Sequence, residues 1–262
     1  MIVYQKELKQ AIKPFCIWTV SIAFMMLLCI LLFPEMKGEM DSVGDLFANM
    51  GGFTAAFGMD KLNFGELMGF YGIECGNILG IGGGFFAALV GISALSKEEK
   101  EHTAEFLLTH PVSRFSVITQ KLLSVLTQVV LLNTAVVAVS LIAVAAIGEK
   151  VQMKEFFLLH LAYTVMQLEI SCICFGISAF IKRGSIGVGL GVPLALYFLN
   201  LVRNISDRAT FLRYVTPYAY AEASDILADA RLAWGPMLLG ILFAALAIAT
   251  AYVKYMKKDI AA

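Results

Sequence analysis

The chain has 262 residues, of which 59% are hydrophobic and 15% are charged, and its mean hydropathy is +0.79. A soluble domain usually carries about 25% charged residues, so this composition indicates a chain that faces lipid rather than water. The 20 Lys and Arg residues balance the 20 Asp and Glu residues, and without a basic field we expect no nucleic-acid partner.

Six segments are apolar over about the 20 residues that a membrane-spanning helix requires. Backbone groups in lipid must be hydrogen-bonded within the protein, and no alternating pattern typical of a β-barrel is present. We therefore expect an all-α integral membrane protein with one transmembrane domain over residues 1–262. The expected spans are 14–33, 70–95, 115–147, 156–181, 185–202 and 233–255.

The first residues, 1–13, read "MIVYQKELKQAIK" and place Tyr4, Leu8 and Ile12 on one helical face, with lysines on the other. This pattern predicts an interfacial helix that bends into the first span at Pro14. A plain solvated lead-in is the alternative. The first span is too long for the apolar region of a signal peptide and no small-residue cleavage site follows, so we interpret it as an uncleaved span.

Basic residues set the expected orientation. With the N-terminus inside, 12 of the 20 Lys and Arg residues fall on the inner side and 8 on the outer side. Lys182 and Arg183 lie in a short inner connection and carry most of the signal. We expect a multi-pass protein of the plasma membrane, in a bacterium, with both termini in the cytoplasm.

Two longer segments fall outside under this topology. Residues 34–69 contain apolar residues at helical spacing from Val43 to Phe53, which predicts a helix on the outer membrane surface. Residues 203–232 form an extracellular helical segment that Thr216-Pro217 splits into two short pieces.

The second span carries a glycine at every fourth position, at Gly72, Gly76, Gly80 and Gly84. Such a stripe lets helices approach closely in lipid, so we expect helix packing there. A hinge that opens a path is the alternative. The nearby "GIGGG" lacks the Lys-Ser/Thr of a phosphate-binding loop.

The cysteines and histidines suggest no metal site. All five cysteines lie in apolar runs, and Cys172-Ile173-Cys174 has neither metal-ligand nor redox spacing. We interpret them as small buried hydrophobic residues.

One polar stretch, "SKEEKEHTAEFLLTHPVSR", interrupts the apolar chain between the second and third spans. Ser96 and Glu99 can form a capping box, Pro111 ends the helix, and Ser113 can cap the next one. The stretch therefore predicts a short amphipathic helix on the cytoplasmic face, held at each end by a membrane helix. An ordinary solvated loop helix is the alternative.

The same stretch resembles the cytoplasmic signature of ABC-2 type transporter permeases, the transmembrane subunits of ABC exporters. The signature has a Glu-rich start, Gly-Thr-x-Glu, two leucines and Pro-x-Ser-Arg. His102 stands where the family has Gly, and Lys121 fits a lysine early in the third span. The matching residues are Glu98, Thr103, Glu105, Leu107, Leu108, Pro111, Val112, Ser113 and Arg114. The resemblance extends over nearly the whole chain.

The resemblance implies that residues 96–113 are a coupling helix seated in a groove of a separate ATP-binding subunit. Two permease units, identical or different, would then work with two ATPase subunits, which bind the ATP and Mg, and transport would be export. This chain has no P-loop motif, so we expect no cofactor and no catalytic residue on it. Phe106 and Leu107 are candidates for the apolar anchor. The expected contact residues are Glu98, Glu101, His102, Thr103, Glu105, Phe106, Leu107, Pro111 and Arg114.

Polar side chains within the spans are costly and often functional, so they are candidates for a translocation path. The path candidates are Glu169, Gln128, Asn133, Glu74 and Asn77, and Gln167 and Asn200 are also intramembrane polar residues. Glu169 lies near mid-depth and either lines the path or locks two helices together. A second class of function remains open, an autonomous secondary transporter or an intramembrane enzyme that uses Glu169 and Glu74. The cargo is not specified by the sequence.

Overall fold

The computed structural model describes residues 2–48, 51–59, 61–97, 113–181 and 186–257, and the side chains of the first range as far as residue 38. Every regular element in these ranges is a helix, and six of the helices are long and apolar enough to cross a membrane. The all-helical fold class is confirmed, and these helices agree in number with the six predicted spans.

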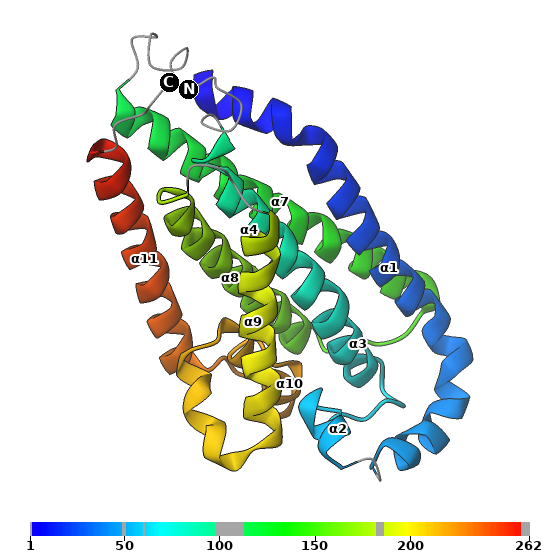
Figure 1. Ribbon diagram of the computed structural model, residues 1–262. Helices are drawn as coiled ribbons and strands as arrows, with labels where there is room; N and C mark the ends of the chain where they lie inside the picture. The colour runs from blue at the N-terminus through cyan, green and yellow to red at the C-terminus, as the bar shows by residue number, and fades with distance from the viewer. Residues whose placement is uncertain (1, 49–50, 60, 98–112, 182–185, 258–262) are drawn as a thin grey trace.

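The first helix, α1 (Ile2–Ala48), is longer than predicted. It joins the predicted interfacial helix, the first span and the start of the outer segment into one helix, with Pro14 and Pro34 inside it. Its first turns run across the end of the bundle before the helix turns along it (Figure 1). A proline inside a helix bends it by removing one backbone hydrogen bond without requiring that the helix end.

The second span is built from three consecutive helical pieces. These are α3 (Leu67–Cys75), the π-helix η1 (Gly76–Gly82) and α4 (Gly83–Ser93). A π-helical turn inside an α-helix is uncommon and leaves backbone carbonyls free for other donors. The glycine spacing did not predict this change of helix type.

The remaining spans follow the predicted boundaries closely. They are α7 (Arg114–Ile147), α8 (Met153–Ser178), α9 (Ile186–Ile205) and α11 (Trp234–Lys257). Helix α7 begins at the predicted cap, because Ser113 Oγ accepts a hydrogen bond from the Ser116 N–H at 3.2 Å. It ends at Gly148, which adopts the left-handed conformation common after helices.

Short helices gather at the end of the bundle opposite the termini. They are α2 (Gly52–Ala56), the 3-10 helices η2 (Asp207–Tyr214) and η3 (Pro217–Ala219), and α10 (Ala223–Asp229). Thr216 separates η2 from η3, and its hydroxyl accepts from the Tyr218 N–H at the start of η3. The split at Thr216-Pro217 is therefore observed, with one more helical piece than predicted.

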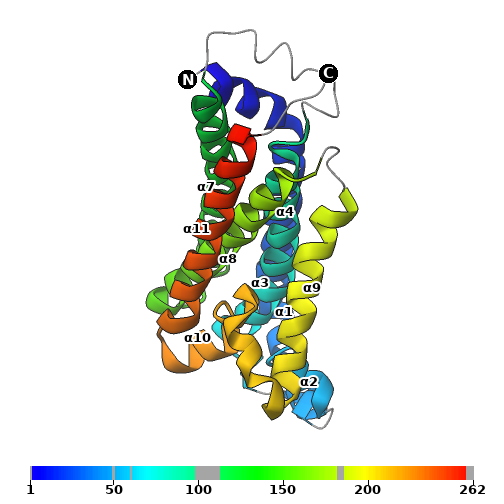
Figure 2. The same cartoon turned by 60° about the vertical axis from the view of Figure 1, so that its left-hand side comes forward.

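Helix α8 lies in the middle of the bundle, between α4, α7 and α11 (Figures 1 and 2). Helix α1 packs along α7, and α9 lies against α4. The start of α1 and the end of α11 lie at the same end, where α4 ends and α7 begins (Figure 1). This end is called the terminal end below, and the opposite one the far end.

Candidate functional site

The predicted coupling helix lies largely outside the described residues. Glu98, Glu101, His102, Thr103, Glu105, Phe106, Leu107 and Pro111 all belong to the range 98–112. Its two described boundaries are Lys97, which follows α4, and Ser113, which caps α7. The hydroxyl of Ser96, predicted to cap the coupling helix, donates to Ile92 O at 2.9 Å.

An ion-pair cluster holds one of these boundaries in place. The carboxylate of Glu7 on α1 pairs with Lys97 and, at 2.9 Å, with Lys121 on α7. The Lys121 side chain is fully buried, and its ammonium also donates to Ala94 O at 2.8 Å. The Glu7–Lys97–Lys121 cluster thus connects α1, the end of α4 and α7.

Further contacts tie the other boundary to the neighbouring helices. Arg114 Nη1 donates to Met256 O near the end of α11, at 3.4 Å. Thr119 on α7 and Tyr252 on α11 share a hydroxyl hydrogen bond of 2.8 Å. The Lys97 boundary is therefore connected to α1 directly and to α7 through Glu7, and the Arg114 boundary is connected to α11.

The glycine stripe of the second span faces α8 and the far-end helices. A Cβ at Gly76 or Gly80 would lie 3.1 Å from the Tyr163 ring or hydroxyl. A Cβ at Gly84 would lie 2.3 Å from Tyr218 Oη, and one at Gly72 would lie 2.7 Å from Leu227 Cδ1. The four glycines leave room for large side chains from neighbouring elements.

The π-helix η1 is held by side chains from two other elements. Gln167 Nε2 on α8 donates to Leu79 O at 3.1 Å, and Tyr218 Oη donates to Gly80 O at 3.4 Å. Both acceptors are backbone carbonyls of the glycine-rich segment. The geometry couples η1 to α8 and to the far-end segment.

Two of the predicted polar residues meet at the centre of the bundle. Asn133 Nδ2 on α7 donates to Gln167 Oε1 at 2.7 Å, and Gln167 in turn reaches η1. Asn133 Oδ1 is buried without a hydrogen-bond partner among the described residues. These amides form a buried link across α7, α8 and η1.

A second buried layer escaped the sequence analysis. The Tyr71 hydroxyl on α3 donates to Ser140 Oγ on α7 at 3.0 Å and lies 2.6 Å from His160 Nε2 on α8. Tyrosine, serine and a lone histidine on apolar helices are common core residues, so the sequence contains no signal that pairs them. A tyrosine and a histidine on different spans are recognised as partners only after the spans are placed.

The other path candidates do not converge with this link. Gln128 donates to Ser124 O within α7. Glu74 on α3 accepts a long thiol contact from Cys29 on α1, with a sulfur–oxygen distance of 3.7 Å. Asn77 lines a separate cavity toward the far end. The five candidates thus lie in several environments rather than along one polar track.

Glu169 occupies a buried position between α8 and the far-end segment. Its side chain is 3% exposed, and Oε2 accepts a hydrogen bond from the Tyr220 hydroxyl at 2.7 Å. A Cβ at Gly240 on α11 would lie 2.1 Å from the same oxygen, so that glycine makes room for the carboxylate. Burial and the neighbouring carboxylate raise the pKa of the Tyr220 phenol well above its ordinary value. Tyr220 therefore acts as the hydrogen-bond donor of the pair.

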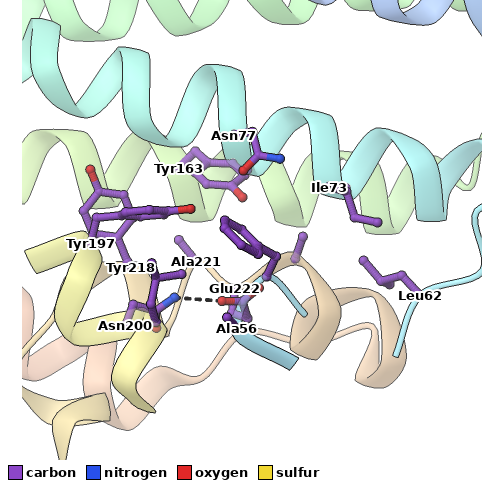
Figure 3. Close-up of a pocket in the computed structure, with 15 residues that line it drawn as sticks. Ala56, Leu62, Ile73, Asn77, Tyr163, Tyr197, Asn200, Tyr218, Ala221 and Glu222 are labelled. Carbon is purple, nitrogen blue, oxygen red and sulfur yellow. Dashed lines mark hydrogen bonds between the residues drawn. The ribbon is translucent and has the colours of Figure 1, made fainter. Parts of the chain in front are cut away.

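A small cavity of about 40 Å³ lies where α3, η1, α8, α9 and the α10 region meet (Figure 3). Asn77, Tyr163 and Glu222 are among its lining residues. Glu222 Oε2 accepts from Asn200 Nδ2 at 2.8 Å and from Asn204 Nδ2 at 3.0 Å. This carboxylate joins α9 to the start of α10, and nothing in the local sequence singled it out.

No group of three or more His, Cys, Asp or Glu side chains that could hold a metal ion occurs in the described part of the chain. The contacts described above join helices to one another.

Comparison with known families gives one full-length result. The model of the ABC-2 family transporter protein matches residues 1–260. A search among curated proteins found no match. A family match over nearly every residue, on a helical chain with six candidate spans, settles the classification. The chain belongs to the ABC-2 family of transporter membrane proteins.

Proposed function

We propose that this chain is the permease subunit of an ATP-driven exporter, in which residues 96–113 receive force from a separate ATP-binding subunit. Family membership supports the transporter class and a partner of this kind. The proposal adds three points to family membership: the direction of transport is export, residues 96–113 couple the chain to the ATPase, and two permeases work together.

The observation that carries the proposal is the attachment of both boundaries of 98–112. Lys97 is bound through Glu7 to α1 and sits beside Lys121 on α7, while Arg114 contacts α11. A rigid-body push on the connection would then move packed helices together, a common way of switching conformation. A loop that merely covered the membrane surface would not need such attachments.

The central amides provide a route for that motion. Helix α7 bears both Lys121 and Asn133, and Asn133 leads through Gln167 to the π-helix η1. Because π-helical turns inside α-helices occur frequently at functional sites, we place the expected hinge of the second span at η1. This interpretation combines the packing and hinge alternatives for the glycine stripe.

The autonomous alternative receives no structural support. Glu169 contacts Tyr220 and faces Gly240, whereas Glu74 contacts Cys29 on α1. Among the described residues, the two carboxylates therefore have separate partners and share no ion site.

The experiment is affinity purification of the tagged full chain from its native membrane, with identification of any ATP-binding protein that is retained with it. Glu105→Arg and Phe106→Ala should each abolish retention of the ATP-binding subunit and its ATPase activity in the complex. Phe211→Ala, at an exposed phenylalanine of the far end, is the matched control and should retain both. Unchanged retention by both coupling variants would refute the proposal.

A further inference from the structure

The small cavity at the far end has a buried acceptor in its wall that no other residue satisfies. Asn200 lines the cavity and is 4% exposed, and its Oδ1 has no hydrogen-bond partner among the described residues. Buried polar atoms in folded proteins are nearly always hydrogen-bonded. An unpaired acceptor in the wall of a cavity therefore indicates that the cavity receives a ligand that donates hydrogen bonds.

The wall of the cavity also contains a carboxylate with unused acceptor capacity. Oε2 of Glu222 accepts from the side-chain amides of Asn200 and Asn204, whereas Oε1 accepts no hydrogen bond from the described residues. No described lysine or arginine forms an ion pair with this carboxylate, and Arg203 pairs with Asp225 instead. The donors that the fold supplies to Glu222 are therefore neutral amides.

Tyrosine rings form much of the remaining wall. Tyr163 on α8, Tyr197 on α9 and Tyr218 on η3 lie together on one side of Asn200 and Glu222 (Figure 3). The rings of Tyr197 and Tyr218 meet edge to face, with centroids 5.4 Å apart and an interplanar angle of 74°. Groups of aromatic rings attract cations, and this is how many ammonium ligands are recognised.

We propose that this cavity binds the primary ammonium group of a small amine. The N–H groups of the ammonium donate to Asn200 Oδ1 and to the Glu222 carboxylate, and the tyrosine rings lie beside its charge. A charged donor bonds a carboxylate more strongly than a neutral donor such as water does. The volume of about 40 Å³ has room for about three non-hydrogen atoms, since about 10–15 Å³ holds one water molecule.

Other cations fit the described wall less well. A calcium ion takes about six to eight oxygen ligands, often from several carboxylates, whereas Glu222 is the one carboxylate among the described residues that line the cavity. A quaternary ammonium has no N–H group to donate to Asn200 Oδ1. The combination of unpaired acceptor oxygens and aromatic rings is therefore best matched by a primary ammonium.

Saturation-transfer NMR of the methyl protons of methylammonium tests the site on the full chain in maltoside micelles. Saturation should transfer from the unmodified protein, and Glu222→Gln should abolish the transfer because glutamine has no charge and one acceptor oxygen. Asp229→Asn, at an exposed carboxylate of the same end, should preserve it. Tyr197→Leu should weaken the apparent affinity about tenfold, which is the scale of one desolvated cation–π contact.

The competing cations decide the chemistry of the site. Tetramethylammonium should not displace methylammonium, and displacement by potassium chloride at the same concentration would assign the site to a metal ion and overturn the proposal. Equal transfer in Glu222→Gln and Asp229→Asn, or none from the unmodified protein, would also overturn it. Thermal unfolding without methylammonium shows whether each variant is folded. If Glu222→Gln is not folded, unchanged affinity in Tyr197→Leu overturns the proposal.

Discussion

The two ends of the bundle are both held by polar networks, but the networks differ in burial and in what they join. At the terminal end, Glu7 on α1 bridges the partly exposed Lys97, which follows α4, and the fully buried Lys121 on α7. At the far end, Glu222 accepts from two amides, and Asp225 pairs with Arg203 and Lys61 on a more exposed surface. The terminal-end cluster therefore joins long helices directly, whereas the far end is assembled from short pieces around α9.

The largest effect is expected at the terminal end. Glu7→Gln would remove the carboxylate that pairs with both Lys97 and the buried ammonium of Lys121, which keeps its bond to Ala94 O. Loss of one partner from a buried pair costs about 3 kcal/mol or more of unfolding free energy. Thermal unfolding of the detergent-solubilised protein measures this loss. Glu35→Gln, at an exposed carboxylate of the same helix, should leave the melting temperature unchanged.

The second-largest loss of stability is expected at the contact between α4 and α8. A Cβ at Gly91 would lie 2.3 Å from Ser171 O, a backbone atom that cannot turn away. Gly91→Ala should therefore destabilise the protein by about 2 kcal/mol in the same unfolding measurement, as overpacked cores do. Gly191→Ala is the control, because nothing lies within 4 Å of the added atom. Similar melting temperatures for both variants would show that α4 and α8 are not packed this closely.

Substitution of Glu222 at the far end should reduce the free energy of unfolding by less than the two changes above. Glu222→Gln removes the charge that accepts from Asn200 and Asn204, and charge-assisted hydrogen bonds contribute about 1.5 kcal/mol or more each. Because glutamine can still accept one of them, we expect a loss of about 1.5 kcal/mol. Asp229→Asn, at an exposed residue of the same end, serves as the control. A loss of stability as large as that of Glu7→Gln would contradict the prediction that the far-end network stabilises the fold less than the terminal-end cluster.

The smallest effect is expected at Lys61. Its ion pair with Asp225 measures 3.1 Å, but both side chains are about half exposed and Arg203 also pairs with Asp225. Exposed ion pairs contribute between about 0 and 1 kcal/mol. Lys61→Gln should thus change the unfolding free energy by less than about 0.5 kcal/mol, at low and high salt alike. A larger, salt-dependent loss would mean that the far-end surface is more tightly organised than its exposure suggests.

Hydropathy was sufficient to locate the spans, because about 20 apolar residues are needed to cross the lipid and few other features imitate them. The predicted span 115–147 and the observed α7 (Arg114–Ile147) differ by a single residue, and the cap at Ser113 was predicted by its residue type. Length was harder to predict at α1, since prolines at 14 and 34 suggested boundaries that the helix passes through.

The sequence could not predict which side chains on different spans contact each other. Lys121 was noticed as a match to a family pattern, yet Glu7, its partner, lies 114 residues away in a segment that reads as an amphipathic lead-in. Asn133 and Gln167 were each recognised as intramembrane polar residues, but their pairing depends on how α7 and α8 pack. Glycine spacing indicated close approach without indicating that η1 would be a π-helix.

The central claim is that the segment between α4 and α7 contacts an ATP-binding subunit, and site-specific crosslinking tests it most directly. A photoreactive amino acid at position 106 of the full chain, expressed in its native host, should form a crosslink to an ATP-binding protein. The same group at position 211, at the far end, should form none. A crosslink from position 211 but not from position 106 would contradict the account.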